Sequence, residues 1–436
     1  RDAARDAHVS RLEGDLRLMY RRHKEELSTA TQRYQGAAAR CTVLSARCAE
    51  QQRVLAECRE WQAETEQLHA LLELAFEAPS RMPNNPHLKN KARGQEAATQ
   101  AALATQQFAT AYRFASEIEN WRKGACYADL AAALLDQDAA TEVQWLLDAA
   151  MEVAEAPAAE TVDQEWRRDR VRSKVAAVYL KLGLEDEAKE TVRGLQASET
   201  TYFEQILAAQ LTPEQVDQQL DVVPELIQSA NFEQQVSILT NVALLHNGHY
   251  EDEARRTRAK EVLMANWGKL PVQVHIDLMI QMAEGALEHQ DAAGAVALAD
   301  EARTRLGGVD LAAETYIAFR AQLAKVLARA EAAPQAIDGL DAAMAIYEAE
   351  RSRLVDMFRA GVLRPVAEAY LVAGATERAE EIYLLALEEG ALNPNSRPRA
   401  LDLTETLASM VRFGFVPTAQ LSSKIEEVSA GLGEPW

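Results

Sequence analysis

The stretch RPVAEAYLVAGATERAEEIYLLALEEGALNP, from Arg364 to Pro394, decides how this sequence folds. Small and aromatic residues recur in it at helical spacing on either side of a glycine: Ala367, Tyr370, Gly374, Ala379, Tyr383 and Ala386. Small residues let two helices approach closely, and a glycine between them can adopt the left-handed conformation that ends the first helix. The stretch offers no evident acid, base or metal ligand, so we interpret it as a packing unit.

The same frame returns elsewhere in the sequence. RSKVAAVYLKLGLEDEAKETVRGL, residues 172–195, repeats the glycine and the small residue after it as Gly183 and Ala188. Further copies place a small or β-branched residue at the start of each second helix, which gives nine anchors at spacings of 28 to 45 residues: Ala111, Val143, Ala188, Val216, Ala254, Ala295, Ala336, Ala379 and Ala419. No alternating β-branched run bounded by turns predicts a strand.

These copies resemble the tetratricopeptide repeat, whose signature over about 34 residues combines a helix-A aromatic, a glycine, a helix-B alanine and a closing proline. HEAT-type repeats of about 40–47 residues are the competing family, but the glycine-then-alanine spacing of the two best copies argues against them. The resemblance implies an all-α solenoid of about eight or nine helix pairs over residues 95–436. It also implies a concave side, lined by the A helices, that binds peptides or helices.

Residues 1–76 carry a different pattern. Apolar or small residues recur at steps of three and four, from Val9, Leu12 and Leu16 to Leu68, Leu72 and Ala75. We therefore expect a long helix or coiled coil that mediates homo-oligomerisation or tethering. Residues 77–94 contain three prolines and adjacent asparagines, which predicts a linker or hinge.

Charge restricts the classes of partner. The formal net charge is −21 and resides entirely after residue 76, because the first 76 residues hold equal numbers of basic and acidic side chains. Such an acidic body repels phosphate backbones, so we expect no nucleic-acid partner. No apolar run reaches the roughly 18 residues that span a bilayer. The alanine-rich acidic repeats indicate a bacterial source.

The compartment stays open from sequence. The protein opens on Arg1 within charged sequence, as after processing, so it is either cytoplasmic or, with an export signal removed, periplasmic or in the cell envelope. Four cysteines are too few for a disulfide scaffold. Cys41, Cys48 and Cys58 lie in the heptad region, as small helix positions or as partners in intermolecular disulfides. Cys126 is expected to be buried.

Motifs for chemistry are missing. The sequence contains no phosphate-binding glycine loop, no nucleophile elbow, no zinc-protease motif and no paired C-x-x-C. His246 and His249 are three residues apart but flank the helix-ending Asn247-Gly248, so we expect a turn there rather than a metal site. We expect no enzyme activity, no cofactor and no metal.

The candidate partner-binding residues come from one charge anomaly and from the family's groove positions. WRRDRVRSK, residues 166–174, is a basic segment in an acidic protein, suited to an acidic segment or to the C-terminal carboxylate of a partner. The alternative is a solvated face that pairs with acidic neighbours. Arg167 is a candidate as part of this basic segment. The resemblance assigns the other candidates to the groove: Arg170, Lys174, Lys181, Gln281, Glu284, Gln322, Lys325, Arg364 and Glu368.

The sequence thus predicts a non-catalytic protein-interaction scaffold that binds a partner segment on the concave face of its repeats. The alternative is a structural subunit of an envelope, filament or large complex that packs through the solenoid and coil. A helical-repeat enzyme with an unrecognised site is a third hypothesis.

Overall fold

The computed structural model describes residues 62–137, 143–156, 165–195 and 211–436. The protein divides into two compact units, Arg1–Ala70 and Leu71–Trp436. In the first unit, residues 62–70 are helical, and residues 1–61 of the coiled-coil prediction lie outside the described residues, together with Cys41, Cys48 and Cys58. The second unit begins with a helix over residues 71–80 and is described below.

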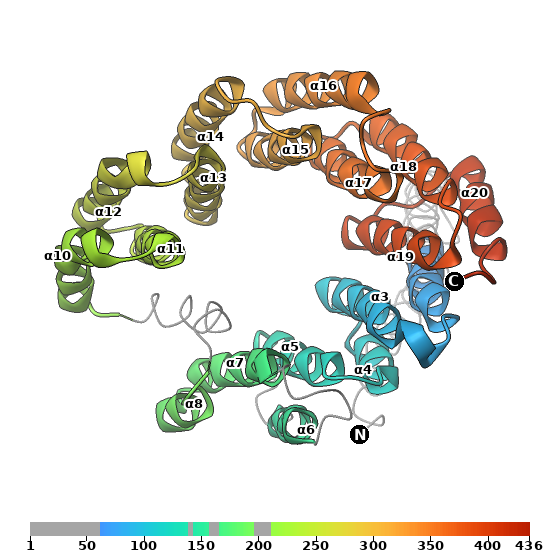
Figure 1. Cartoon of the computed structure of the whole chain (residues 1–436), viewed down its shortest axis with the longest axis horizontal. Coiled ribbons are helices and arrows are strands. Elements are labelled where there is room, and N and C mark those ends of the chain that lie inside the picture. The colour runs from blue at the N-terminus through green and yellow to red at the C-terminus, as the bar shows by residue number, and fades with distance from the viewer. Residues whose placement is uncertain (1–61, 138–142, 157–164, 196–210) are drawn as a thin grey trace, which may run out of the picture. The chain divides into compact units, whose positions relative to one another are not determined.

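The described part of the second unit is all-α, without a strand, as the sequence predicts (Figure 1). Its odd-numbered helices are α3 (Asn84–Ala104), α5 (Arg122–Leu135), α7 (Glu165–Lys181), α11 (Phe232–Gly248), α13 (Val272–Glu288), α15 (Ala313–Arg329), α17 (Asp356–Val372) and α19 (Ser396–Arg412). Its even-numbered helices are α4 (Phe108–Glu117), α6 (Gln144–Glu155), α8 (Glu185–Thr191), α10 (Pro213–Ser229), α12 (Glu253–Asn266), α14 (Ala292–Gly307), α16 (Ala333–Glu350), α18 (Thr376–Ala391) and α20 (Ala419–Ala430). A short 3₁₀ helix, η3 (Trp267–Lys269), follows α12.

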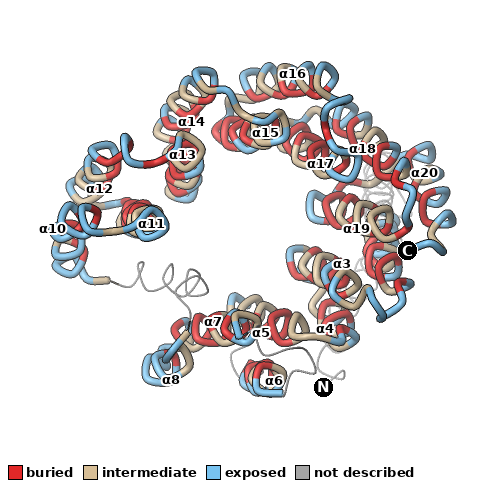
Figure 2. The backbone as a smooth tube through the Cα atoms, viewed as in Figure 1, coloured by how far each residue is buried: buried red, intermediate tan, exposed pale blue. Residues whose placement is uncertain are grey.

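Helices pack in consecutive pairs, and neighbouring pairs stack on one another within α3–α8 and within α10–α20. Each odd helix contacts the even helix after it, and odd helices also contact one another, as in α11–α13–α15–α17–α19 and in α3–α5–α7. The sides of the helices that face one another are buried, whereas the outward sides are exposed (Figure 2). Because one pair cannot bury both of its apolar sides alone, stacking is what completes the core.

Six of the odd helices end in the same turn. A residue with positive φ follows each of them: Gln106, Gly183, Gln290, Glu331, Gly374 and Gly414. The next amide then donates to the carbonyl five positions earlier, as Ala375 does to Tyr370 at 2.9 Å, which is the Schellman arrangement. Glycine therefore marked only some of the turns, since glutamine and glutamate adopt the same left-handed conformation at the others.

The predicted anchors begin alternate helices, and seven of the nine are buried: Ala111, Val143, Ala188, Val216, Ala295, Ala336 and Ala379. The assignments of Ala254 and Ala419 are wrong, because both side chains are exposed. In α12 the position equivalent to Ala295, four residues after the N-cap, is Arg256, whose guanidinium lies over the Tyr250 ring at 4.4 Å. In α20 the buried residues are Leu421, Ile425, Val428 and Ser429.

Residues 77–94 differ from the predicted linker. Most of them belong to helices, and Ala78, Met82 and Ala92 are almost completely buried. Pro83 is the N-cap of α3, and Pro86 lies near the start of α3 where the backbone is not helical, so neither removes a helical hydrogen bond. Pro79 also packs against Gly94.

The two ends of the second unit pack together. Helix α19 contacts α3, and the Thr404 hydroxyl donates to the Ala75 carbonyl at 3.0 Å. The Arg81 guanidinium donates to the Ser429 carbonyl at 2.9 Å. The stack therefore continues from the last helices of the sequence into the first ones of this unit, out of sequence order.

Candidate partner-binding surfaces

Helices α13 and α15 present a polar face that makes few contacts within the protein. On α13, Asp277, Glu284 and Glu288 are exposed at spacings of seven and four residues, with the partly buried Gln281 between them. The three carboxylates form no ion pair with any described residue. Incomplete hydration raises the pKa of Asp277 and of Glu284, so both carboxylates would gain from a cationic partner.

Helix α15 places basic and amide groups beside this stripe. Gln322 and Arg329 are exposed, and Lys325 is partly buried one turn from each. Arg329 and Lys325 lie close enough to Glu284 to oppose the rise of its pKa. We call this surface the α13–α15 face: Asp277, Gln281, Glu284, Glu288, Gln322, Lys325 and Arg329.

At α17 and α19 the equivalent positions are occupied by internal contacts. Glu368 is buried, pairs with Lys325 and accepts a hydrogen bond from the Ser409 hydroxyl at 2.7 Å. Arg364 pairs with Asp402 at 3.2 Å, although burial still raises the pKa of that carboxyl. The predicted groove residues Arg364 and Glu368 therefore join neighbouring helices.

The basic side chains of the α7 segment contact different neighbours. Burial disfavours the charge of Lys174, but its ion pair with Asp129 on α5 outweighs this and raises its pKa. Lys181 lies 3.5 Å from Asp136. Arg170 stacks near the rings of Trp121 and Trp166, and Arg167 also lies over Trp166. The segment is therefore engaged mainly with neighbouring helices and aromatic rings.

Two further arginines of the same basic segment lie outside the predicted groove positions. Arg168 and Arg172 lie one turn apart on α7 and line a cavity of about 440 Å³ between α6, α7 and α8. The signal that could have identified them is their spacing of four residues, which places both on one side of a helix.

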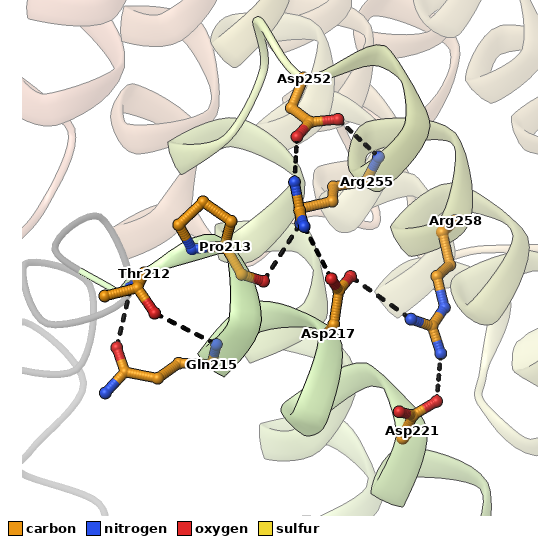
Figure 3. Close-up of polar contacts among 8 residues, drawn as sticks. All are labelled: Thr212, Pro213, Gln215, Asp217, Asp221, Asp252, Arg255 and Arg258. Atoms are coloured by element: carbon orange, nitrogen blue, oxygen red, sulfur yellow. Dashed lines mark hydrogen bonds and ion pairs between the residues drawn. The ribbon is translucent and has the colours of Figure 1, made fainter.

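The even-numbered helices α10 and α12 are joined by an exposed ionic network (Figure 3). Arg255 pairs with Asp252 and with Asp217 at 2.7 Å, and it donates to the Pro213 carbonyl at 3.1 Å. Arg258 pairs with Asp221 and, at 3.4 Å, with Asp217. This network links two neighbouring repeats, and each of its carboxylates already has a cationic partner.

The remaining histidine and cysteine candidates are internal. His246 is buried, with its Nδ1 2.8 Å from the Asn247 side-chain oxygen. Across the described ranges no group of His, Cys, Asp or Glu side chains could hold a metal ion. Burial raises the pKa of the Cys126 thiol well above its usual value, which keeps it protonated.

Comparison with known proteins returned no match among family models, curated proteins or solved structures. No described helix is long and apolar enough to cross a membrane. Function must therefore be inferred from the surfaces themselves.

Proposed function

We propose that this protein is a non-catalytic, tetratricopeptide-like α-solenoid that binds a protein partner through the α13–α15 face. The observation that supports this is the contrast between neighbouring repeats. Equivalent side chains are engaged internally at α5, α7, α17 and α19, whereas Asp277, Glu284 and Glu288 on α13 form no ion pair with any described residue.

The chemistry of this face favours a partner segment that carries basic residues. Three unpaired carboxylates on one side of α13 attract Lys or Arg, and Arg329 on α15 can receive an acidic residue of the same segment. Complementary charges of this kind set the orientation and specificity of an interface. For this surface we therefore propose a basic partner segment. The basic segment of α7 had suggested an acidic peptide.

The test compares two variants of equal charge change. The first is Asp277→Asn, Glu284→Gln and Glu288→Gln. The control is Asp338→Asn, Glu225→Gln and Glu348→Gln, which neutralises exposed carboxylates of even-numbered helices. Affinity purification from the native source with quantitative mass spectrometry should recover one partner with the wild type and the control, and lose it with the first variant. Equal recovery by both variants would refute the assignment of the face.

Oligomerisation through residues 1–76 is the second part of the proposal. Because the second unit begins at Leu71, the informative truncation is 71–436. Size-exclusion chromatography with light scattering should give an oligomer for the full-length protein and a monomer for the truncation. A monomeric full-length protein would remove this role.

The alternative, a structural subunit, is favoured by an apolar surface at the ends of α17 and α18. Val355, Met357, Phe358 and Leu392 are all between 45% and 59% exposed. Exposed apolar groups of this size promote contact with another protein surface. Filaments in negative-stain micrographs that disappear on Phe358→Ser would favour this function over partner binding.

A further inference from the structure

The cavity between α6, α7 and α8 is lined by charged side chains, some of which form no ion pair with any described residue. Its volume of about 440 Å³ lies within the range of small-ligand pockets. Its lining comes from all three helices: Met151, Glu155, Arg168, Arg172, Glu190 and Thr191.

Two arginines of the lining have free donors. Among the described residues Arg168 forms no hydrogen bond or ion pair, and Arg172 donates only to the Arg193 carbonyl at 3.3 Å. Side chains four residues apart on a helix lie about 5–6 Å apart at Cβ, so both guanidinium groups can reach one ligand. Guanidinium groups bind carboxylates through two parallel hydrogen bonds.

The two carboxylates of the lining differ in whether they form an ion pair. Glu190 pairs with Arg193 at 2.9 Å, so its charge is balanced. Glu155 lines the same cavity as both arginines, yet it forms no ion pair with either of them or with any other described residue. The cavity thus has two unbalanced positive charges and one unbalanced negative charge.

A ligand that completes this arrangement carries two carboxylates and one ammonium group. One carboxylate for each arginine and an ammonium group for Glu155 would give each of these solvent-accessible charges a partner of opposite sign. A phosphate dianion fits less well, because it has no ammonium group to pair with Glu155, whose charge would repel it.

We propose that this cavity binds a dicarboxylic α-amino acid, of the class of glutamate and aspartate. Arg168 and Arg172 hold the two carboxylates, Glu155 accepts from the ammonium group, and Met151 contacts the methylene groups. The site is separate from the partner-binding role, so binding here is expected whether or not the α13–α15 face binds a protein.

The test uses the full-length protein with ¹³C-methyl-labelled methionine. Met151 lines the cavity, and its methyl resonance among the nine methionines is identified with Met151→Leu. The probes are L-glutamate, L-aspartate, L-glutamine, glutarate and inorganic phosphate. We expect saturable shifts of the Met151 methyl with L-glutamate or L-aspartate, and at least tenfold weaker binding of L-glutamine.

Matched variants assign the roles. Arg168→Gln and Arg172→Gln should each weaken L-glutamate binding at least tenfold, whereas Arg303→Gln, at a partly exposed arginine of α14 that pairs with Asp300, should leave it unchanged. Glu155→Gln should remove the preference for L-glutamate over glutarate, because only the ammonium group distinguishes the two. The other methionine resonances report whether each variant keeps its fold.

Two results would overturn the proposal. One is a Met151 resonance that L-glutamate and L-aspartate leave unchanged at tens of millimolar. The other is an equal shift with inorganic phosphate, which would reduce the effect to non-specific anion binding.

Discussion

The packing of α19 against α3 can be tested at Gly94, where the two ends of the second unit meet. A Cβ atom at this position would lie 2.6 Å from Pro79 Cβ, 2.9 Å from Pro79 Cγ and 3.3 Å from Leu401 Cδ2. The first two atoms belong to a ring that cannot rotate away. Gly94→Ala therefore forces α3 away from the preceding helix and from α19, which typically costs about 1–3 kcal/mol.

The control is Gly339→Ala in α16, where nothing lies within 4 Å of the added Cβ atom. Both substitutions gain the same helix propensity, about 1 kcal/mol, so their difference isolates the steric cost. The control gives the change in local stability that is expected from helix propensity alone. In Gly94→Ala, amide hydrogen exchange should show that the local stability of α3 and α19 is about 1–3 kcal/mol below this expected value. This corresponds to roughly 5- to 150-fold faster exchange.

The assay must be local, because unfolding of a long helical array is not a single two-state transition. If Gly94→Ala stabilises α3 and α19 as much as Gly339→Ala stabilises α16, there is no steric cost, and Pro79 and Leu401 do not pack against Gly94 as described.

Three further predictions concern the core. Glu368→Ala should lower local stability by about 2–3 kcal/mol in urea-dependent hydrogen exchange, because it leaves the partly buried Lys325 without its ion-pair partner. Glu368→Gln should cost less, because the glutamine oxygen can still accept the hydrogen bond from Ser409. Burial lowers the pKa of His275. The imidazole of the unfolded state therefore binds a proton first as the pH falls below about 6.5, and the free energy of unfolding decreases. His275→Phe should make the free energy of unfolding depend less on pH between about pH 7.5 and 5.5. Ala295→Leu should lower the local stability of α14 in amide hydrogen exchange by about 1–3 kcal/mol, whereas Ala254→Leu, at an exposed site, should leave the local stability of α12 unchanged.

Local patterns in the sequence determined the class of fold. Helical spacing, small residues and the glycines at positions 183 and 374 predicted paired helices, and seven of nine anchors are buried. These features are recorded in the sequence because each acts within one helix or one turn. The same locality explains the error at Ala254, since which residues of α12 are buried, Ala259 and Leu263 among them, depends on the neighbouring helices.

Tertiary structure alone decided which polar side chains have no partner within the described residues and are available to bind another molecule. Lys174, Arg364 and Glu368 carry the same kinds of charge in sequence as Asp277, Glu284 and Arg329, yet only the first three are consumed by internal partners. Those partners lie 38 to 45 residues away, one repeat along the stack. The contact of α19 with α3 spans about 300 residues, and no local pattern records it. A pattern within one helix fixes which face is buried, but the charge left on a surface depends on which helices stack beside it.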